Sequence, residues 1–378
     1  MRVVFWGTYD TGKPRTRILR DGLRANGVEV GEIHAPVWEG VEDKSQVRGL
    51  AAKLRIALRW MLAYPWLAWR LLRMPRPDLL LVGYPGIVDV LIAAPIARMR
   101  RIPLAWDIFL SMYDTVCEDR LLLVPGGTPA RLLWWLERIA IRRADFPFMD
   151  TRAHARRVER LFGLPEGRCG SVWVGAETQH FPRREQASGA RRETAMSVLF
   201  YGQFIPLHGI DTIVAAAALL RSEPIHWTLV GRGQEGGRIR AMLAADPLPK
   251  VEWIDWVDYA QLERKIAAAD LCLGIFGTST KAACVIPNKV FQIAAAGRPL
   301  VTRDSPAIRE LLPHSPPCVY LVPPGDPRAL ADAVLAHSRV PHHGIDHCHG
   351  VMAQDIDARA IGRQFLEMIG QHRNWKQP

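Results

Sequence analysis

The chain alternates between short apolar runs and amphipathic segments over most of its length. The apolar run 2–6 precedes a glycine-containing turn, a helical pattern over 16–23 and a second apolar run at 28–33. Runs that are apolar on both faces and separated by helices are typical of a parallel sheet covered by helices on both sides. The same alternation restarts at 197–201. The pattern therefore predicts an α/β fold with two Rossmann-like, doubly wound domains.

A polar, charged stretch separates the two series of strands. We place an N-terminal domain at 1–183, a linker at 184–196, a second domain at 197–340 and a C-terminal tail with a helix at 341–378. A chain of 378 residues is long for one compact core and ordinary for two.

The formal net charge of +11 is unevenly distributed. Residues 1–180 hold 27 Lys and Arg against 19 Asp and Glu, so most of the excess lies in the first half. Such an imbalance favours a polyanionic neighbour, namely nucleic acid, an anionic membrane or a phosphorylated substrate. No nucleic-acid-binding motif accompanies it, so we expect no nucleic-acid partner.

Cysteine usage indicates a reducing compartment. The six cysteines are widely spaced and form no CxxC pair, which is typical of reduced thiols in a cytoplasmic protein. The N-terminus runs directly into an apolar run and does not read as a signal peptide. Near the C-terminus four histidines and Cys348 cluster at 342–349, but adjacent imidazoles have no framework here to aim them at one ion. We therefore predict no metal site.

A segment rich in Trp and basic residues, which we expect to be helical near 47–73, differs from the rest of the chain. The stretch 44–76 carries eight Lys or Arg and no acidic residue, with large apolar side chains between them. Its apolar core, 60–69, is shorter than the roughly 20 residues that span a bilayer. A basic helix with Trp and Leu suits the surface of an anionic membrane. The alternative is an amphipathic helix packed on its own sheet with a solvated basic edge.

Ligands of doubly wound domains bind at the carboxyl ends of the strands, and three such places carry polar groups. The loop Gly7-Thr8-Tyr9 follows the first strand but does not form GxGxxG. Asp107 ends another strand, where it could contact a ligand or serve as a structural carboxylate. The loop at 276–288 combines Thr278 and Ser279 with Lys281 and Lys289, so amides and lysines could hold a pyrophosphate. Taken singly, the hydroxyl residues also fit ordinary helix N-caps, and Lys289 an ordinary first-turn lysine.

Four segments of the second domain carry motifs, and the first half adds looser matches in PDLLLVGYPG and VWVGAET. The four are VLFYGQFIPLHGIDTIV, LVGRGQ, FGTSTKAACVIPNKVFQIAAAGRPLVT and VPPGDPRALADAV. Together they resemble the family 4 glycosyltransferases. The resemblance implies the GT-B fold, in which two Rossmann-like domains face each other across a crevice. It also implies retaining sugar transfer from a nucleotide-diphosphate sugar without a metal or other cofactor.

Several functional residues of the family are replaced by other residue types at the matching positions of this chain. In the family's E-x7-E signature the second glutamate, which binds the ribose, falls at Gln292. The first glutamate falls at Cys284, which cannot replace it. The donor-sugar hydroxyls would therefore bind backbone groups of Ala283, Cys284 and Val285. Gln203 and His208 occupy places where the family has an Arg and a Lys for the pyrophosphate. Lys281, Lys289 and Arg232 become the replacement candidates. The other donor-side candidates are Gly202, Gly209, Gly233, Thr278, Ser279 and Asn288.

The catalytic candidates implied by the resemblance are Asp107 and Lys281, and Gly7, Thr8 and Tyr9 are acceptor-side candidates. We expect a glycan or lipid-linked acceptor, as in a bacterial envelope pathway, and a protein held at the inner face of the membrane. Two alternatives remain. One is a nucleotide-sugar epimerase on the same fold, and the other is a non-catalytic nucleotide- or glycan-binding protein at the membrane surface.

Overall fold

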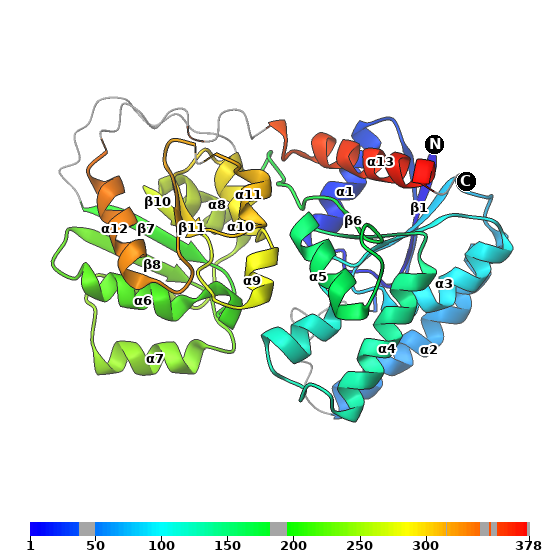
Figure 1. Cartoon of the computed structure of the whole chain (residues 1–378), viewed down its shortest axis with the longest axis horizontal. Helices are drawn as coiled ribbons and strands as arrows, with labels where there is room; N and C mark the ends of the chain where they lie inside the picture. The colour runs from blue at the N-terminus through cyan, green and yellow to red at the C-terminus, as the bar shows by residue number, and fades with distance from the viewer. Residues whose placement is uncertain (38–49, 182–194, 315, 341–347, 349–353, 376–378) are drawn as a thin grey trace. The chain divides into compact units, whose positions relative to one another are not determined.

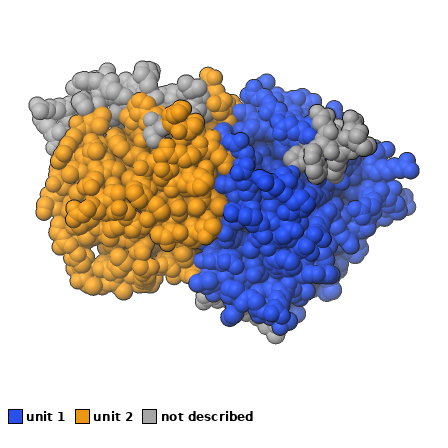
Figure 2. Space-filling model, viewed as in Figure 1, with its two compact units in different colours: residues 1–174, 358–378 blue, residues 175–357 orange. Residues whose placement is uncertain are grey.

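The computed structural model describes residues 1–37, 50–181, 195–314, 316–340, 348 and 354–375. The chain forms two compact units, residues 1–174 with 358–378 and residues 175–357, drawn blue and orange in Figure 2. Each unit contains one six-stranded, fully parallel sheet with helices around it (Figure 1). The predicted α/β class with two doubly wound domains is confirmed.

The sheet of the first unit has the strand order β2-β1-β3-β4-β5-β6. Its strands are β1 (Arg2–Gly7), β2 (Glu29–His34), β3 (Leu79–Val82), β4 (Leu104–Asp107), β5 (Phe146–Met149) and β6 (Gly170–Ser171). The central strands β3, β4 and β5 are buried throughout, because helices cover both faces.

Two separate cores lie on the two faces of this sheet. One includes side chains from α2 (Leu50–Arg73), α3 (Ile87–Met99), α4 (Thr128–Arg143) and α5 (Arg152–Phe162). The other includes side chains from α1 (Pro14–Ala25) and α13 (Ala358–Trp375). In the first layer α3 packs against both α2 and α4. These three helices therefore form one continuous covering.

Helix α13 returns the C-terminus to the first unit, where it lies beside α1 (Figure 1). The two helices approach closely because Gly22 and Gly362 meet: a Cβ on Gly22 would lie 2.0 Å from the carbonyl oxygen of Ala358. The units therefore differ from the sequence-based domains. The first ends at Val174 instead of 183 and regains the helix that we had assigned to a tail, and the proposed linker lies largely outside the described residues.

The second unit has the strand order β12-β11-β10-β7-β8-β9. The strands are β7 (Met196–Tyr201), β8 (Ile225–Val230), β9 (Val251–Ile254), β10 (Leu271–Leu273), β11 (Leu300–Arg303) and β12 (Val319–Val322). The helices are α6 (Ile210–Leu219), α7 (Gly236–Ala245), α8 (Tyr259–Ala268), α9 (Thr280–Cys284), α10 (Asn288–Ala295), α11 (Ile308–Leu311) and α12 (Pro327–Ser338).

Sequence patterns missed three helices that bury few apolar side chains. These are α5, α7 and α8, which have buried faces of only a few residues. Two of them begin at caps that the sequence does show: the Thr151 hydroxyl accepts from the His154 amide, and Asp258 accepts from the Gln261 amide. Such caps mark a helix N-terminus even where the apolar periodicity is weak.

Candidate functional site

The carboxyl edge of the sheet in the second unit is built from close backbone contacts that only glycine allows. Gly202 follows β7 with φ +142° and Gly231 follows β8 with φ +147°. A Cβ on Gly231 would lie 1.9 Å from the carbonyl oxygen of Gly202. The two loops therefore pass each other directly, and glycine backbone forms the rim at the ends of these two strands.

Lys289 points its ammonium group toward this rim from the first turn of α10. The residue is 5% exposed, and Nζ lies 3.8 Å from the centroid of the Phe200 ring. A Cβ on Gly202 would lie 2.9 Å from the same nitrogen. Nζ finds no hydrogen-bond acceptor among the residues that the structure describes. Burial holds the pKa of Lys289 well below its ordinary value.

An unpaired ammonium in such a place is expensive, because desolvation opposes the charged form and only aromatic faces compensate it. A bound anion at the rim would supply the missing partner. The prediction that Lys289 contacts a pyrophosphate is consistent with this geometry. Its alternative, an ordinary first-turn lysine in solvent, does not fit a side chain buried to this degree.

His208 and Gln203 hold the loop after β7 together. The Nδ1 atom of His208 contacts the Gln203 carbonyl oxygen, and its ring packs edge-on against Phe200 at 5.7 Å between centroids. Gly209 follows in the left-handed conformation with φ +63° and begins α6. The His208 ring is thus oriented by the loop itself, with Phe200 shared between it and Lys289.

The loop after β10 uses several of its own amides internally. The Gly277 amide donates to the Leu207 carbonyl at 3.2 Å, and the Ala283 amide donates to the Ser279 carbonyl at 3.2 Å. The Ser279 hydroxyl caps α9 by accepting from the Ala282 amide at 3.1 Å. Ser279 is thus an ordinary helix N-cap, which was the alternative to a role in pyrophosphate binding. The amides of Gly277 and Ala283 already donate hydrogen bonds within the protein.

The remaining donor-side candidates differ in exposure. Lys281 and Cys284 on α9 are buried, at 3% and 6% exposed, and Val285 directly follows them. Thr278, Arg232 and Gly233 are exposed, and Asn288, the first residue of α10, is partly exposed.

Gln292 lies one helical turn after Lys289 and is also buried. Its Oε1 accepts a hydrogen bond of 3.0 Å from the Tyr201 hydroxyl, which also reaches the Lys289 carbonyl at 3.3 Å. The amide is therefore oriented by a residue at the end of β7. Tyr201 therefore uses one of the two acceptor positions of the Gln292 side-chain carbonyl.

Arg303, at the end of β11, was not singled out from the sequence. It is 6% exposed, and its guanidinium donates to the Gly277 carbonyl. Burial lowers the pKa of Arg303, while Cys284 and Asp304 oppose that change. An arginine at the last position of a predicted strand on the ligand-binding edge was the available signal.

In the first unit, the acceptor-side candidates are engaged with one buried carboxylate. The Thr8 amide and hydroxyl both donate to Asp89, at 2.8 and 3.0 Å, and a Cβ on Gly7 would collide with the same carboxylate. Burial raises the pKa of Asp89 to about 6, although hydrogen bonds from Thr8 oppose the shift. Tyr9 is buried and donates to Glu32 at 2.9 Å. The polar groups of Thr8 and Tyr9 thus serve the internal structure of this unit.

Asp107 ends β4 as predicted, but it is neither open to a ligand nor bonded to a helix N-terminus. It forms a buried ion pair with Arg15, whose Nε donates to its two oxygens at 2.8 and 2.7 Å. The other guanidinium nitrogens of Arg15 reach the Val172 and Met149 carbonyls. Burial raises the pKa of Asp107, and Arg15 counteracts that rise. This geometry favours a structural role over the catalytic one.

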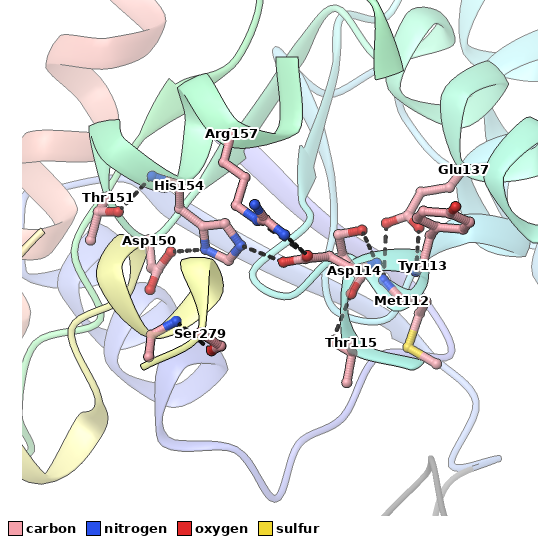
Figure 3. A network of polar contacts seen from close by, with 12 residues as sticks. Met112, Tyr113, Asp114, Thr115, Glu137, Asp150, Thr151, His154, Arg157 and Ser279 are labelled. Atoms are coloured by element: carbon pink, nitrogen blue, oxygen red, sulfur yellow. Dashed lines mark hydrogen bonds and ion pairs between the residues drawn. The ribbon is translucent and has the colours of Figure 1, made fainter. Parts of the chain in front are cut away.

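A second polar network lies nearby in the same unit (Figure 3), and the contacts among Asp114, Asp150 and His154 were not predicted from the sequence. The Nδ1 atom of His154 lies 2.6 Å from Asp150, and its Nε2 atom faces Asp114 at 4.0 Å. Arg157 makes an ion pair with the same Asp114. His154 is fully buried, and this network connects the loop after β4 with the start of α5.

Glu137 of α4 also binds the loop that follows β4. It accepts from the amides of Met112 and Tyr113, at 3.1 and 2.9 Å, just before the π-helix Asp114–Asp119 (Figure 3). Burial raises the pKa of Glu137 to about 7, and the backbone donors oppose this shift. Isolated π-helical turns are frequent at functional sites. In the sequence, the signal for Glu137 was a single carboxylate in a segment of mostly basic and apolar residues.

The six cysteines are free thiols; five are buried and Cys318 is half-buried. The histidine cluster at 342–349 lies outside the described residues apart from Cys348. In the described part of the chain, no group of His, Cys, Asp and Glu is arranged to hold a metal ion.

Two family models match the chain in succession. Residues 11–170 match the model described as "Glycosyl transferase 4-like domain", and residues 195–338 match "Glycosyl transferases group 1". A curated relative, the "Putative colanic acid biosynthesis glycosyl transferase WcaI" of Escherichia coli (strain K12), is 23% identical over 174 residues. That alignment covers 46% of this chain and 42% of the relative, so it spans less than half of either protein.

Solved structures resemble the chain over its full length. The crystal structure of HepE from Anabaena in complex with UDP-glucose has a TM-score of 0.64 at 14% identity, covering 98% of this chain and 100% of that one. Sucrose-phosphate synthase from Thermosynechococcus elongatus has a TM-score of 0.68 at 15% identity, with 100% of both chains covered. At these identities the likeness concerns the fold alone.

Proposed function

The chain belongs to the family 4 glycosyltransferases and has the GT-B fold, and from this premise we propose that it transfers a sugar from a nucleotide-diphosphate sugar to an acceptor with retention of configuration. The second unit would bind the donor at the carboxyl edge of its sheet. The HepE structure, which was solved with UDP-glucose, supports a nucleotide sugar as the class of donor.

One observation carries this proposal. Lys289 holds a buried ammonium group beside the glycine rim of β7, with no acceptor for Nζ in the described chain. The diphosphate of a nucleotide sugar is the anion that a sugar transferase has to bind at this edge. Lys289 would take over the role that an Arg and a Lys have at the positions of Gln203 and His208 in the family.

The chemistry needs positive charge more than a nucleophile. As the bond from the sugar to the diphosphate breaks, negative charge grows on the leaving oxygen, and a preorganised cation stabilises it. Lys289 would supply this cation, with Lys281 and the exposed Arg232 as further candidates. In the retaining reaction the leaving phosphate would accept the acceptor's proton on the same face of the sugar.

A first test replaces Lys289 by methionine, which keeps the length and apolar character of the side chain. A charge-assisted contact contributes about 1.5–3 kcal/mol, so the affinity for the cognate nucleoside diphosphate should fall roughly 10- to 100-fold. Calorimetric titration of UDP, GDP and ADP measures this change and identifies the base.

Lys265→Met is the matched control, because it removes a partly exposed lysine from the last turn of α8 in the same unit. Its affinity should stay within about twofold of the parent, as expected for a surface charge. Equal affinities in the parent and Lys289→Met would contradict the proposed diphosphate contact. Analysis of the products formed from a labelled nucleotide sugar with and without acceptor separates transfer from epimerisation.

For the acceptor, we propose a lipid-linked glycan reached at the inner membrane surface. Supporting this, α2 exposes an apolar stripe along most of its described length: Leu54, Leu58, Met61, Leu62, Trp66, Trp69 and Leu72. Arg70 and Arg73 lie over the rings of Trp66 and Trp69, at 5.7 and 5.8 Å from the centroids. Apolar and aromatic groups with arginines above them suit the interface of an anionic bilayer.

Neighbouring elements extend the same character. Leu132 and Trp135 of α4 are more than half exposed, as are Leu121 and Val124 in the preceding loop. The only acidic residues on α2, α3 and α4 are Asp89 and Glu137, which are both buried. Within the described residues no helix is both long and apolar enough to cross a bilayer. The proposal is therefore attachment to the surface through this helical layer.

A further inference from the structure

The first unit contains a pocket at the edge of its sheet where the strands begin. It has a volume of about 340 Å³ and lies between the ends of α3 and α4 and the starts of β4 and β5. Because all strands are parallel, this amino edge lies opposite the carboxyl edge that carries Gly7 and Asp107. The pocket is therefore separate from the edge at which doubly wound domains bind their substrates.

Three arginines line this pocket: Arg98, Arg101 and Arg143. All three are exposed, and their guanidinium groups make no hydrogen bond or ion pair with any residue that the structure describes. One carboxylate, Asp145, is also in the wall, and one of its oxygens accepts from the Leu104 amide at 3.0 Å. The lining therefore carries an excess of two positive charges.

The usual reason for arginines at helix C-termini is that their side chains bind the last carbonyls, but other groups do this here. At the end of α3, the Arg100 amide donates to the Ile96 carbonyl and the Ile102 amide to the Ala97 carbonyl. Arg168 donates to four carbonyls at the end of α4 and just after it. The arginines of the pocket are thus not needed to complete these helix ends.

Arg101 is held in a conformation that favours glycine. It follows the C-cap of α3 with φ +53°, and its amide donates to the Arg98 carbonyl at 3.1 Å. The Ile102 amide then reaches the Ala97 carbonyl at 2.8 Å, which completes a Schellman turn. A glycine would avoid the steric cost of this left-handed position, and the arginine found here bears that cost.

We propose that this pocket binds a phosphate group, with Arg98, Arg101 and Arg143 as the donors. Guanidinium groups form paired hydrogen bonds with phosphate oxygens, and three of them around one concavity match a phosphate monoester or diester. The phosphate could belong to a lipid headgroup or to a soluble phosphate ester. This site does not depend on the proposed donor site in the second unit.

The test uses glycerol 3-phosphate as the soluble probe, in the Lys289→Met background so that the donor rim does not compete. Calorimetry should show binding that weakens about tenfold or more in the double variant Arg98→Gln/Arg143→Gln. Arg142→Gln removes an exposed charge from the same turn of α4 outside the pocket lining, and it should change the affinity less than twofold. Unchanged thermal unfolding in each variant shows that the fold is kept.

The second arm identifies the source of the phosphate. Vesicles of phosphatidylcholine with added phosphatidic acid are mixed with the same variants and separated by flotation. A loss in the double variant that exceeds the loss in Arg142→Gln, without measurable binding of glycerol 3-phosphate, assigns the site to a lipid headgroup. Loss of soluble binding assigns it to a soluble ester. If the double variant equals Arg142→Gln with both probes, the proposal is overturned.

Discussion

The burial of Lys289 could not be predicted from its position in the sequence, although it determines the charge properties of this residue. Its ammonium group lies against Phe200 and beside Gly202, where burial lowers the lysine pKa. Burial therefore favours the neutral form of this amine when no anion is bound. A diphosphate at the rim would favour the charged form and raise this pKa.

Nucleotide binding should therefore take up a proton. Between the pKa of Lys289 in the free protein and its higher pKa in the complex, the complex holds more protons, so affinity should fall as pH rises through this window. Calorimetric titrations of the cognate nucleoside diphosphate in buffers with different ionisation enthalpies measure the uptake. Lys289→Met should abolish the uptake, and an identical proton count in parent and variant would assign it to another group.

The same desolvation acts on the ligand-free protein. Because the folded state binds fewer protons than the unfolded state between the two pKa values of Lys289, this residue costs stability below its unfolded pKa, and stability rises with pH through the window. This cost is consistent with the general trade-off between stability and function at binding sites.

At the scale of elements, α2 is a long helix of which only a small part is buried against the sheet. Its 24 residues extend for about 36 Å. Among its described side chains, only Leu67 and Leu71 are fully buried on the sheet. The structural alternative, a helix packed on its own sheet, accounts for these two positions. It leaves the exposed stripe unexplained.

Neutralising α2 should release the protein from anionic vesicles. Replacing Arg55, Arg59, Arg70 and Arg73 by glutamine removes four charges that each contribute about 1 kcal/mol near an anionic surface. We expect at least a 100-fold drop in partitioning onto vesicles with phosphatidylglycerol in a flotation assay, and unchanged affinity for nucleotide. Failure of the parent protein to float with these vesicles at low salt would rule out the membrane proposal.

At the scale of the whole molecule, the C-terminal helix α13 completes a unit that begins at residue 1. Phe365 is fully buried and packs edge-on against Phe148 of β5, with ring centroids 5.4 Å apart. The core beneath α1 also receives Ile361, Met368 and Ile369 from this helix. The first unit therefore depends on residues 361–369 to cover part of one face of its sheet.

Phe365→Ala should destabilise the first unit by about 3–5 kcal/mol, the usual cost of a cavity left by a buried aromatic ring. Denaturant unfolding followed by near-UV circular dichroism should show an earlier transition for one part of the signal. Because the nucleotide is proposed to bind the second unit, its affinity should persist in the variant. Trp256→Ala, at an exposed position of the second unit, is a control that should unfold like the parent.

The arrangement of apolar runs alone predicts two parallel sheets, because strands apolar on both faces are stable only under helices on both sides. Turn glycines and the lysine-containing loop also locate the edge that carries Lys289. The partners of each polar group could not be predicted, since they lie far apart in the chain. Tertiary packing buries Lys289 against Phe200, pairs Asp107 with Arg15, which lies 92 positions away in the chain, and places α13 beside α1. Long-range contacts of this kind decide whether a charge is paired or available, and local sequence patterns do not contain them.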